Sequence, residues 1–149
     1  MRAVVQRVSR AVVRVGQRVT GAIGNGLVAL VGVSADDDEN DAVTTAGKIV
    51  GLRIFSDDAG RMNQCIADVG GSVLLVSQFT LLGDVRKGRR PSFVAAAKEP
   101  LARTLYERVG SSIEAHGIGV AYGEFGADMD LELVNRGPVT ILLDSKRRF

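Results

Sequence analysis

Apolar and polar residues alternate along the first 33 residues with the two-residue period of β-strands. The segments 2–8 and 11–15 are rich in valine and interleaved with arginine, and 18–23 repeats this pattern after a short turn. Residues 27–33, LVALVGV, are apolar at consecutive positions, which is typical of a central strand buried on both faces. We therefore expect the N-terminal part of the chain to be built of strands.

The apolar period lengthens to that of an amphipathic helix in two places. The spacing predicts a helix over 37–51, preceded by aspartates that suit an N-cap, and a second helix over 99–115. The most strongly predicted strand is SVLLVSQFTL, 72–81, and the basic segment 83–92 is expected to be a loop. Shorter strands are predicted at 53–55, 118–122, 130–135 and 139–144. This order indicates the α/β class, with two β-sheet layers and helices packed on one face, in a single domain spanning 1–149.

Composition narrows the possible functions. Hydrophobic residues make up 46% of the chain and charged residues 24%, as in a globular protein with a core, and the net charge of +2 says little about partners. One cysteine excludes an internal disulfide and a thiolate zinc site, and one histidine excludes a histidine-rich metal site. The sequence shows no signal peptide and no apolar run long enough to cross a bilayer, so we expect a soluble cytoplasmic protein.

The usual catalytic groups are missing from the sequence. His116 follows the second predicted helix, where it complements the helix dipole better than it serves a catalytic triad. Cys65 lies among apolar neighbours and is interpreted as a small buried side chain rather than a nucleophile. The chain has no GxGxxG motif and no Walker loop, so no nucleotide cofactor is expected. If the protein is an enzyme, backbone groups or the substrate itself must carry much of the chemistry.

Three segments hold candidate chemistry, and each also has a plain structural explanation. SQFTLLGD, 77–84, interrupts an apolar strand with polar residues near its carboxyl end, where sheets often bind ligands, although local hydrogen bonds explain it equally well. RKGRRPSF, 86–93, suits a phosphate backbone and a stacked base, or it is a solvated basic loop. In NRGPVT, 135–140, the Gly137-Pro138 peptide is a tertiary amide that can adopt the cis form, or it is an ordinary turn joining two strands.

Together, SQFTL at 77–81 and NRGPVT at 135–140 resemble the two signature motifs of the D-aminoacyl-tRNA deacylases. The likeness covers nearly the whole chain, because MRAVVQRVSRA, GAIGNGL, DVGG, RKGRRPSF and FGADM follow in the family's order. The resemblance implies an α/β fold and an enzyme that hydrolyses the ester of D-aminoacyl-tRNA and of glycyl-tRNA mischarged on alanine tRNA. It also implies a homodimer with each active site at the subunit interface, and no metal or cofactor.

The resemblance assigns the residues Ser77, Gln78, Phe79 and Thr80 to the bound ester. The backbone N–H groups of Phe79 and Thr80 would stabilise the oxyanion. A threonine hydroxyl without an adjacent base is a weak nucleophile, so Thr80 is assigned to positioning. The family is described as using the ribose 2′-hydroxyl of the substrate itself, which the protein positions.

The resemblance also implies a chiral filter built of main chain. The carbonyl oxygens of Gly137 and Pro138, in a cis peptide inserted from the other subunit, would exclude L side chains, and Arg7 would support this turn. The other implied contacts are Phe125, Gly126, Ala127 and Met129 to the terminal adenine, and Arg86, Lys87, Arg89 and Arg90 to the tRNA. The C-terminal KRRF, 146–149, lies past the family's features, and its one candidate role is contact with the RNA backbone.

Two other functions remain open at the level of sequence. A relative with a trans Gly137-Pro138 peptide would admit small L-amino acids. A nucleic-acid-binding module without catalysis would depend on the basic loop alone. Replacing Gln78 or Thr80 would spare RNA binding in such a module, whereas the same change would impair an enzyme.

Overall fold

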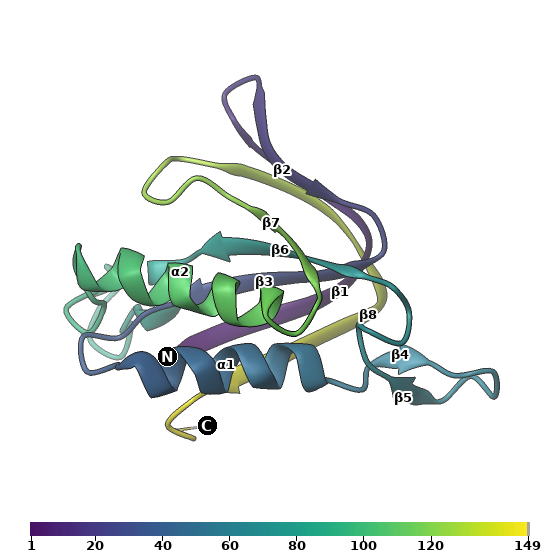
Figure 1. Cartoon of the computed structure of the whole chain (residues 1–149). Helices are drawn as coiled ribbons and strands as arrows, with labels where there is room; N and C mark the ends of the chain where they lie inside the picture. Colours follow the sequence, from purple (N-terminus) through teal and green to yellow (C-terminus); the bar gives the residue numbers. More distant parts are fainter. Residues whose placement is uncertain (149) are drawn as a thin grey trace.

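One long strand lies at the centre of a six-stranded sheet in the structure, a computed structural model that describes residues 1–148 and leaves Phe149 of the KRRF segment outside. The strands are β1 (Arg2–Val15), β2 (Arg18–Ile23), β3 (Gly26–Gly32), β6 (Ser72–Ser77), β7 (Gly119–Tyr122) and β8 (Asp130–Asp144). β1 pairs antiparallel with β2, β3 and β8, whereas β6 pairs parallel with both β3 and β7. The resulting order is β2-β1-β3-β6-β7, with β8 beside β1 (Figure 1).

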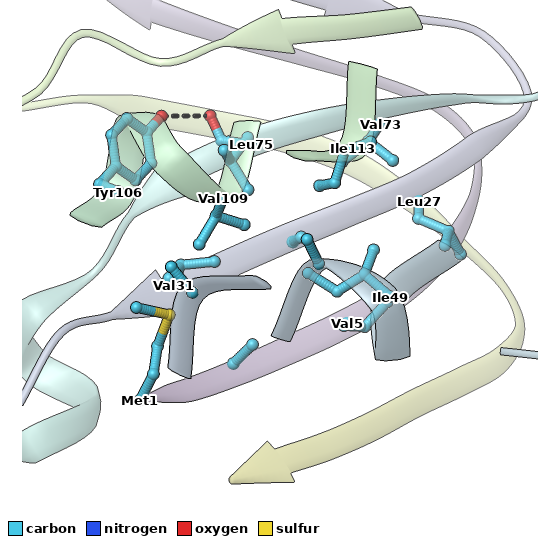
Figure 2. Close-up of a cluster of buried hydrophobic side chains, with 14 of the residues drawn as sticks. Met1, Val5, Leu27, Val31, Ile49, Val73, Leu75, Tyr106, Val109 and Ile113 are labelled. Atoms are coloured by element: carbon cyan, nitrogen blue, oxygen red, sulfur yellow. Dashed lines mark hydrogen bonds between the residues drawn. The ribbon is translucent and has the colours of Figure 1, made fainter. Parts of the chain in front are cut away.

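Two helices, α1 (Glu39–Gly51) and α2 (Leu101–Glu114), cover one side of the sheet (Figure 1). Asp38 caps α1, and Asp41 returns the hydrogen bond in a capping box, as the run of aspartates predicts. The apolar faces of the helices meet alternate residues of the strands, and Figure 2 shows this core. Its largest fully buried side chains include Leu27, Ile49, Leu75 and Ile113.

A second core lies on the opposite face of the same strands. Residues of β3 and β6 alternate between the two cores, with Leu27 and Val73 facing the helices and Val28 and Leu74 facing away from them. The far half of β1, with β2 and the start of β8, curls over this second face (Figure 1). The sequence predicts two strands with a break between them, but β1 is continuous: β8 pairs along both halves, while β3 pairs with the first half and β2 with the second.

The structure corrects two further strand boundaries. The predicted strand 72–81 ends at Ser77, and a 3-10 helix, η1 (Phe79–Leu82), replaces its last residues. The Gln78 N–H still bonds to the Val31 carbonyl at 2.7 Å, whereas the N–H groups of Leu81 and Gly83 bond to the carbonyls three residues before them. The predicted strand 53–55 is displaced to β4 (Phe55–Ser56), which pairs with β5 (Met62–Gln64) in a small separate sheet.

A network of charges joins the two ends of the chain beside α1. The Met1 ammonium lies 2.5 Å from the Asp37 carboxylate, and neither side chain is accessible to solvent. Lys146 and Arg148 form ion pairs with Asp36, and the hydrogen bonds from Ser34 and Arg148 hold the pKa of the Asp36 carboxyl well below its ordinary range. These two C-terminal cations are therefore bound to the acidic loop of the protein itself.

The α/β class with helices on one face of the sheet is confirmed, and the two β layers are parts of one bent sheet. Among the helices in residues 1–148, none combines the length and apolar character needed to cross a membrane.

The buried ion pair at Met1 predicts a large loss of stability when Asp37 is neutralised. Asp37→Asn leaves the Met1 ammonium buried without a counter-charge, and we expect the free energy of unfolding to fall by about 3 kcal/mol or more. Denaturant titration measures this change. Asp58→Asn, at an exposed position in the β4–β5 turn, is the matched control and should change stability by less than about 0.5 kcal/mol. Equal stability of both variants would show that the pair contributes nothing.

Candidate functional site

A cavity lies where β3 and β6 end. Because these strands are parallel, their carboxyl ends meet at one edge of the sheet, the usual place for a ligand in an open α/β sheet. The cavity has a volume of about 470 Å³. Its lining comes from the ends of β3 and β6, from η1, from the start of α2 and from the loop between β7 and β8.

The SQFT segment forms one wall of this cavity. Ser77 is the last residue of β6, and Phe79 and Thr80 begin η1. The Gln78 amide donates a hydrogen bond to the Thr80 hydroxyl at 2.5 Å, which orients both side chains. Within residues 1–148, the backbone N–H groups of Phe79 and Thr80 have no hydrogen-bond acceptor, as is usual where a helix begins. Two adjacent main-chain donors are thus free to bind an oxygen atom.

The FGADM segment forms the facing wall, so the structure brings together the two segments that the sequence assigns to the ester and the adenine. The lining includes Phe125, Gly126, Ala127 and Met129. Tyr106 of α2 lies against Phe125 with ring centres 5.6 Å apart, and its hydroxyl donates to the Leu75 carbonyl at 2.8 Å (Figure 2). Burial raises the pKa of Tyr106, so its hydroxyl stays protonated and acts here as a structural donor.

The cavity is acidic. Its only charged lining residues are Glu99 and Asp128. Within the described chain, Glu99 is bound to Arg103 at 3.1 Å, and Asp128 has no hydrogen-bond or ion-pair partner. No group of three or more His, Cys, Asp or Glu side chains in residues 1–148 is placed to hold a metal ion.

Gly137 and Pro138 do not turn the chain but bulge out of one continuous strand. Both halves of β8 pair with β1, and residues 136–139 stand opposite the single residue Arg7. The expectation of two strands joined by a turn is therefore wrong. The Gly137-Pro138 peptide is cis, and Gly137 has a φ of +130°, which favours glycine. Arg7 donates from Nε to the Arg136 carbonyl at 3.0 Å and from Nη1 to the Ile54 carbonyl, so it braces the bulge.

The bulge lies far from the cavity of its own chain. It belongs to β8, which is separated from β6 by β1 and β3, a distance of about 14 Å across the sheet. Neither Gly137 nor Pro138 lines the cavity, and both are exposed. One chain by itself therefore does not bring the two signature motifs together.

The basic loop is anchored beside the cavity. Asp84 and Ser92 pair across its base, and Phe93 packs edge-on against Phe79 with ring centres 5.0 Å apart. Arg86 is bound to Asp84 through two guanidinium hydrogen bonds of 2.9 and 2.6 Å. The remaining predicted tRNA contacts, Lys87, Arg89 and Arg90, are exposed and make no ion pair within the described chain.

Sequence reasoning missed the contribution of α2 to the cavity. Glu99, Ala102 and Tyr106 all line it, although their spacing in the sequence identifies only a helix that packs against a core. Asp128 also lines the cavity. It lies inside FGADM, but the resemblance assigns a role only to its neighbours. His116 is exposed after α2 as predicted. Cys65 is half-buried rather than fully buried.

Comparisons with known proteins give consistent results. A family model described as D-Tyr-tRNA(Tyr) deacylase matches residues 4–144. The chain is 60% identical to a D-aminoacyl-tRNA deacylase of Anaeromyxobacter dehalogenans over the full length of both, and 52% identical to one of Thermus aquaticus over 99% of this chain and 97% of that one.

Two solved structures are similar in fold. The c-Myc DNA Unwinding Element Binding Protein superposes with a TM-score of 0.90 at 37% identity, covering 97% of this chain and 98% of that one. A probable eukaryotic D-amino acid tRNA deacylase superposes with a TM-score of 0.81 at 18% identity, covering 95% and 97%, which shows the fold alone.

The pairing of Arg86 with Asp84 predicts an unusual titration in the basic loop. Hydrogen bonds from Arg86 lower the pKa of the Asp84 carboxyl from its ordinary 3.8 to about 2. Because the folded value is the lower one, the interaction is complete above about pH 4 and is lost as the pH falls toward 2. Carboxyl NMR of the folded protein should show a midpoint near 2, which rises toward 3.8 in Arg86→Gln but stays below it, because the backbone N–H of residue 86 still donates to Asp84. A normal midpoint in the unmodified protein would mean that Arg86 is free.

Proposed function

The chain belongs to the D-Tyr-tRNA(Tyr) deacylase family and is a D-aminoacyl-tRNA deacylase, and we propose that it proofreads chirality with main-chain atoms shared between two subunits. The single observation that carries the proposal is the separation of the motifs. SQFT lines a cavity, whereas Gly137-Pro138 projects from a distant strand of the same chain. A second subunit that inserts its bulge into this cavity would complete the site.

The chemistry at the SQFT wall suits an ester. The free N–H groups of Phe79 and Thr80 can hold the ester carbonyl oxygen and stabilise the negative charge that develops on it in the tetrahedral intermediate. Gln78 and Thr80 support each other by their hydrogen bond and position the substrate. Within residues 1–148, the Thr80 hydroxyl bonds to the Gln78 amide and to no basic group, so it is a weak nucleophile and the ribose 2′-hydroxyl of the substrate assists the hydrolysis. The products are free tRNA and the D-amino acid.

The filter acts by exclusion. Carbonyl oxygens held in fixed positions by the main chain collide with an L side chain at the α-carbon, whereas a D side chain points elsewhere. Arg7 donates to the Arg136 carbonyl in the bulge and is itself held by the Ile54 carbonyl outside it, so the bulge is braced against the rest of the chain. Glycine has no side chain, so glycyl-tRNA mischarged on alanine tRNA passes the same filter.

The edge of β8 supports a homodimer. This strand has 15 residues, and its outer edge has no partner strand within residues 1–148. Two apolar side chains of this strand, Val134 and Leu142, are 40% and 61% exposed. A long apolar edge strand of this kind is a liability in a monomer and is normally covered. A symmetric dimer that buries it would also carry each Gly137-Pro138 bulge into the partner.

The remaining contacts fit the 3′ end of a tRNA. Phe125, Gly126, Ala127 and Met129 would hold the terminal adenine in the facing wall of the cavity. Lys87, Arg89 and Arg90, together with Arg86 when Asp84 releases it, would meet the RNA backbone outside the cavity. A tRNA substrate places the enzyme in the cytoplasm, where it would serve translation quality control.

Deacylation of D-tyrosyl-tRNA and L-tyrosyl-tRNA, measured side by side, tests the function. We expect hydrolysis of the D ester and of glycyl-tRNA, with the L ester at least about 100-fold slower, because exclusion of a side chain at the filter costs several kcal/mol. Hydrolysis of both tyrosyl esters at similar rates would contradict the proposed chiral filter. RNA binding without hydrolysis would favour the alternative of a binding module.

Mixed dimers test whether the two motifs act across subunits. Gln78→Ala disables the cavity, and Gly137→Ala displaces the bulge, since a Cβ there would lie 2.8 Å from both Arg7 and Val139. Each variant alone should lose D-specific deacylation. Subunit exchange between them should restore about a quarter of the wild-type activity, because half of the randomly formed dimers have one intact site of two. No recovery despite exchange, shown by native mass spectrometry, would place both motifs in the same subunit's site.

A further inference from the structure

The first turn of α2 presents an arginine to the outside of the cavity wall. Glu99 and Ala102 line the cavity, and Arg103 follows Ala102 on the helix without lining it. The Arg103 guanidinium lies 4.6 Å from the centre of the Phe125 ring and 3.1 Å from the Glu99 carboxylate. One cation therefore contacts two residues that line the cavity.

The acidic lining of the cavity would repel a phosphate unless a cation lies nearby. Its charged lining residues, Glu99 and Asp128, are both acidic, yet its proposed occupant is the end of a polyanion. The nucleotide that carries the terminal adenine has a phosphate attached through its ribose, a few ångströms from the base. With the adenine beside Phe125, this phosphate would come within reach of the guanidinium that covers the same ring.

We propose that Arg103 binds the phosphate of the terminal nucleotide, exchanging its ion pair with Glu99 for one with the RNA. This inference rests on the proposed function, in which the 3′ end of an RNA fills the cavity. The planar guanidinium matches a carboxylate and a phosphate with the same pair of N–H groups. The existing pair is exposed and has i,i+4 spacing, so it is weak and readily exchanged. In the free enzyme, Glu99 keeps the arginine in place over Phe125.

The chain offers a matched control on the same helix. Arg108 is 46% exposed, against 45% for Arg103, but it pairs with Glu39 of α1, away from the cavity. A substitution that removed only a surface charge or a helix contact would affect both positions alike. Arg103→Gln and Arg108→Gln therefore separate the proposed role from a general electrostatic one.

Steady-state kinetics with two substrates tests the contact. For D-tyrosyl-tRNA, Arg103→Gln should raise KM about 5- to 10-fold at low salt with little change in kcat, and should lower the slope of log KM against log salt by about 0.7–1. The 2′(3′)-D-tyrosyl ester of adenosine has no phosphate, so its KM should not change. Arg108→Gln should behave as the wild type with both substrates.

Other results would overturn the inference. An equal rise in KM for both substrates would mean that Arg103 only orients Phe125. Equal changes in KM for the Arg103 and Arg108 variants would mean that Arg103 makes no contact with the terminal phosphate. Glu99→Gln should lower the KM for tRNA about 2- to 5-fold by releasing Arg103, and a rise would show that Glu99 itself binds substrate. Wild-type enzyme that hydrolyses neither D ester would overturn the proposed function first, which distinguishes the two failures.

Discussion

The parallel pairing of β3 with β6 is the interaction on which the rest of the structure depends. The two main chains approach so closely at its start that a Cβ on Gly26 would lie 1.9 Å from the Ser72 carbonyl oxygen, so only glycine fits there. From Gly26 and Ser72 the ladder runs to Val31 and Ser77, where both strands end at the cavity. Because successive residues face opposite sides, the same two strands carry the helices on one side and the curled part of the sheet on the other.

This architecture accounts for a site with few conventional catalytic side chains. The strand end leaves two N–H groups free within residues 1–148, and an exposed bulge braced by Arg7 lies elsewhere on the molecule. In the proposed function, main-chain atoms both stabilise the oxyanion and exclude the wrong enantiomer. Main chain suits these tasks because it is stiffer than a side chain, and His116 and Cys65 lie outside the cavity.

Ion pairs have different roles in different parts of the molecule. The pair between Met1 and Asp37 is buried, so it must stay intact for the fold to hold. The pairs of Arg86 with Asp84 and of Arg103 with Glu99 are exposed beside the cavity, and each keeps a cation ordered at little cost. In the proposed function and in the further inference, such exposed cations exchange a carboxylate for a phosphate of the RNA. Burial therefore separates the pairs that stabilise the protein from those that can recognise a ligand.

The sequence by itself determined the class of fold, most elements and the segments that line the cavity. Periodicity locates both helices and β2, β3 and β7 closely, because the side-chain pattern follows which face is buried. It cannot tell that β1 and β8 are continuous, or that β6 stops at Ser77, because these boundaries depend on which strands become neighbours. Only the tertiary structure decided that Glu99, just before α2, lines the cavity, that α2 places Arg103 over Phe125, and that Gly137-Pro138 lies away from the cavity. Such contacts join residues far apart in the chain, and no local pattern encodes them.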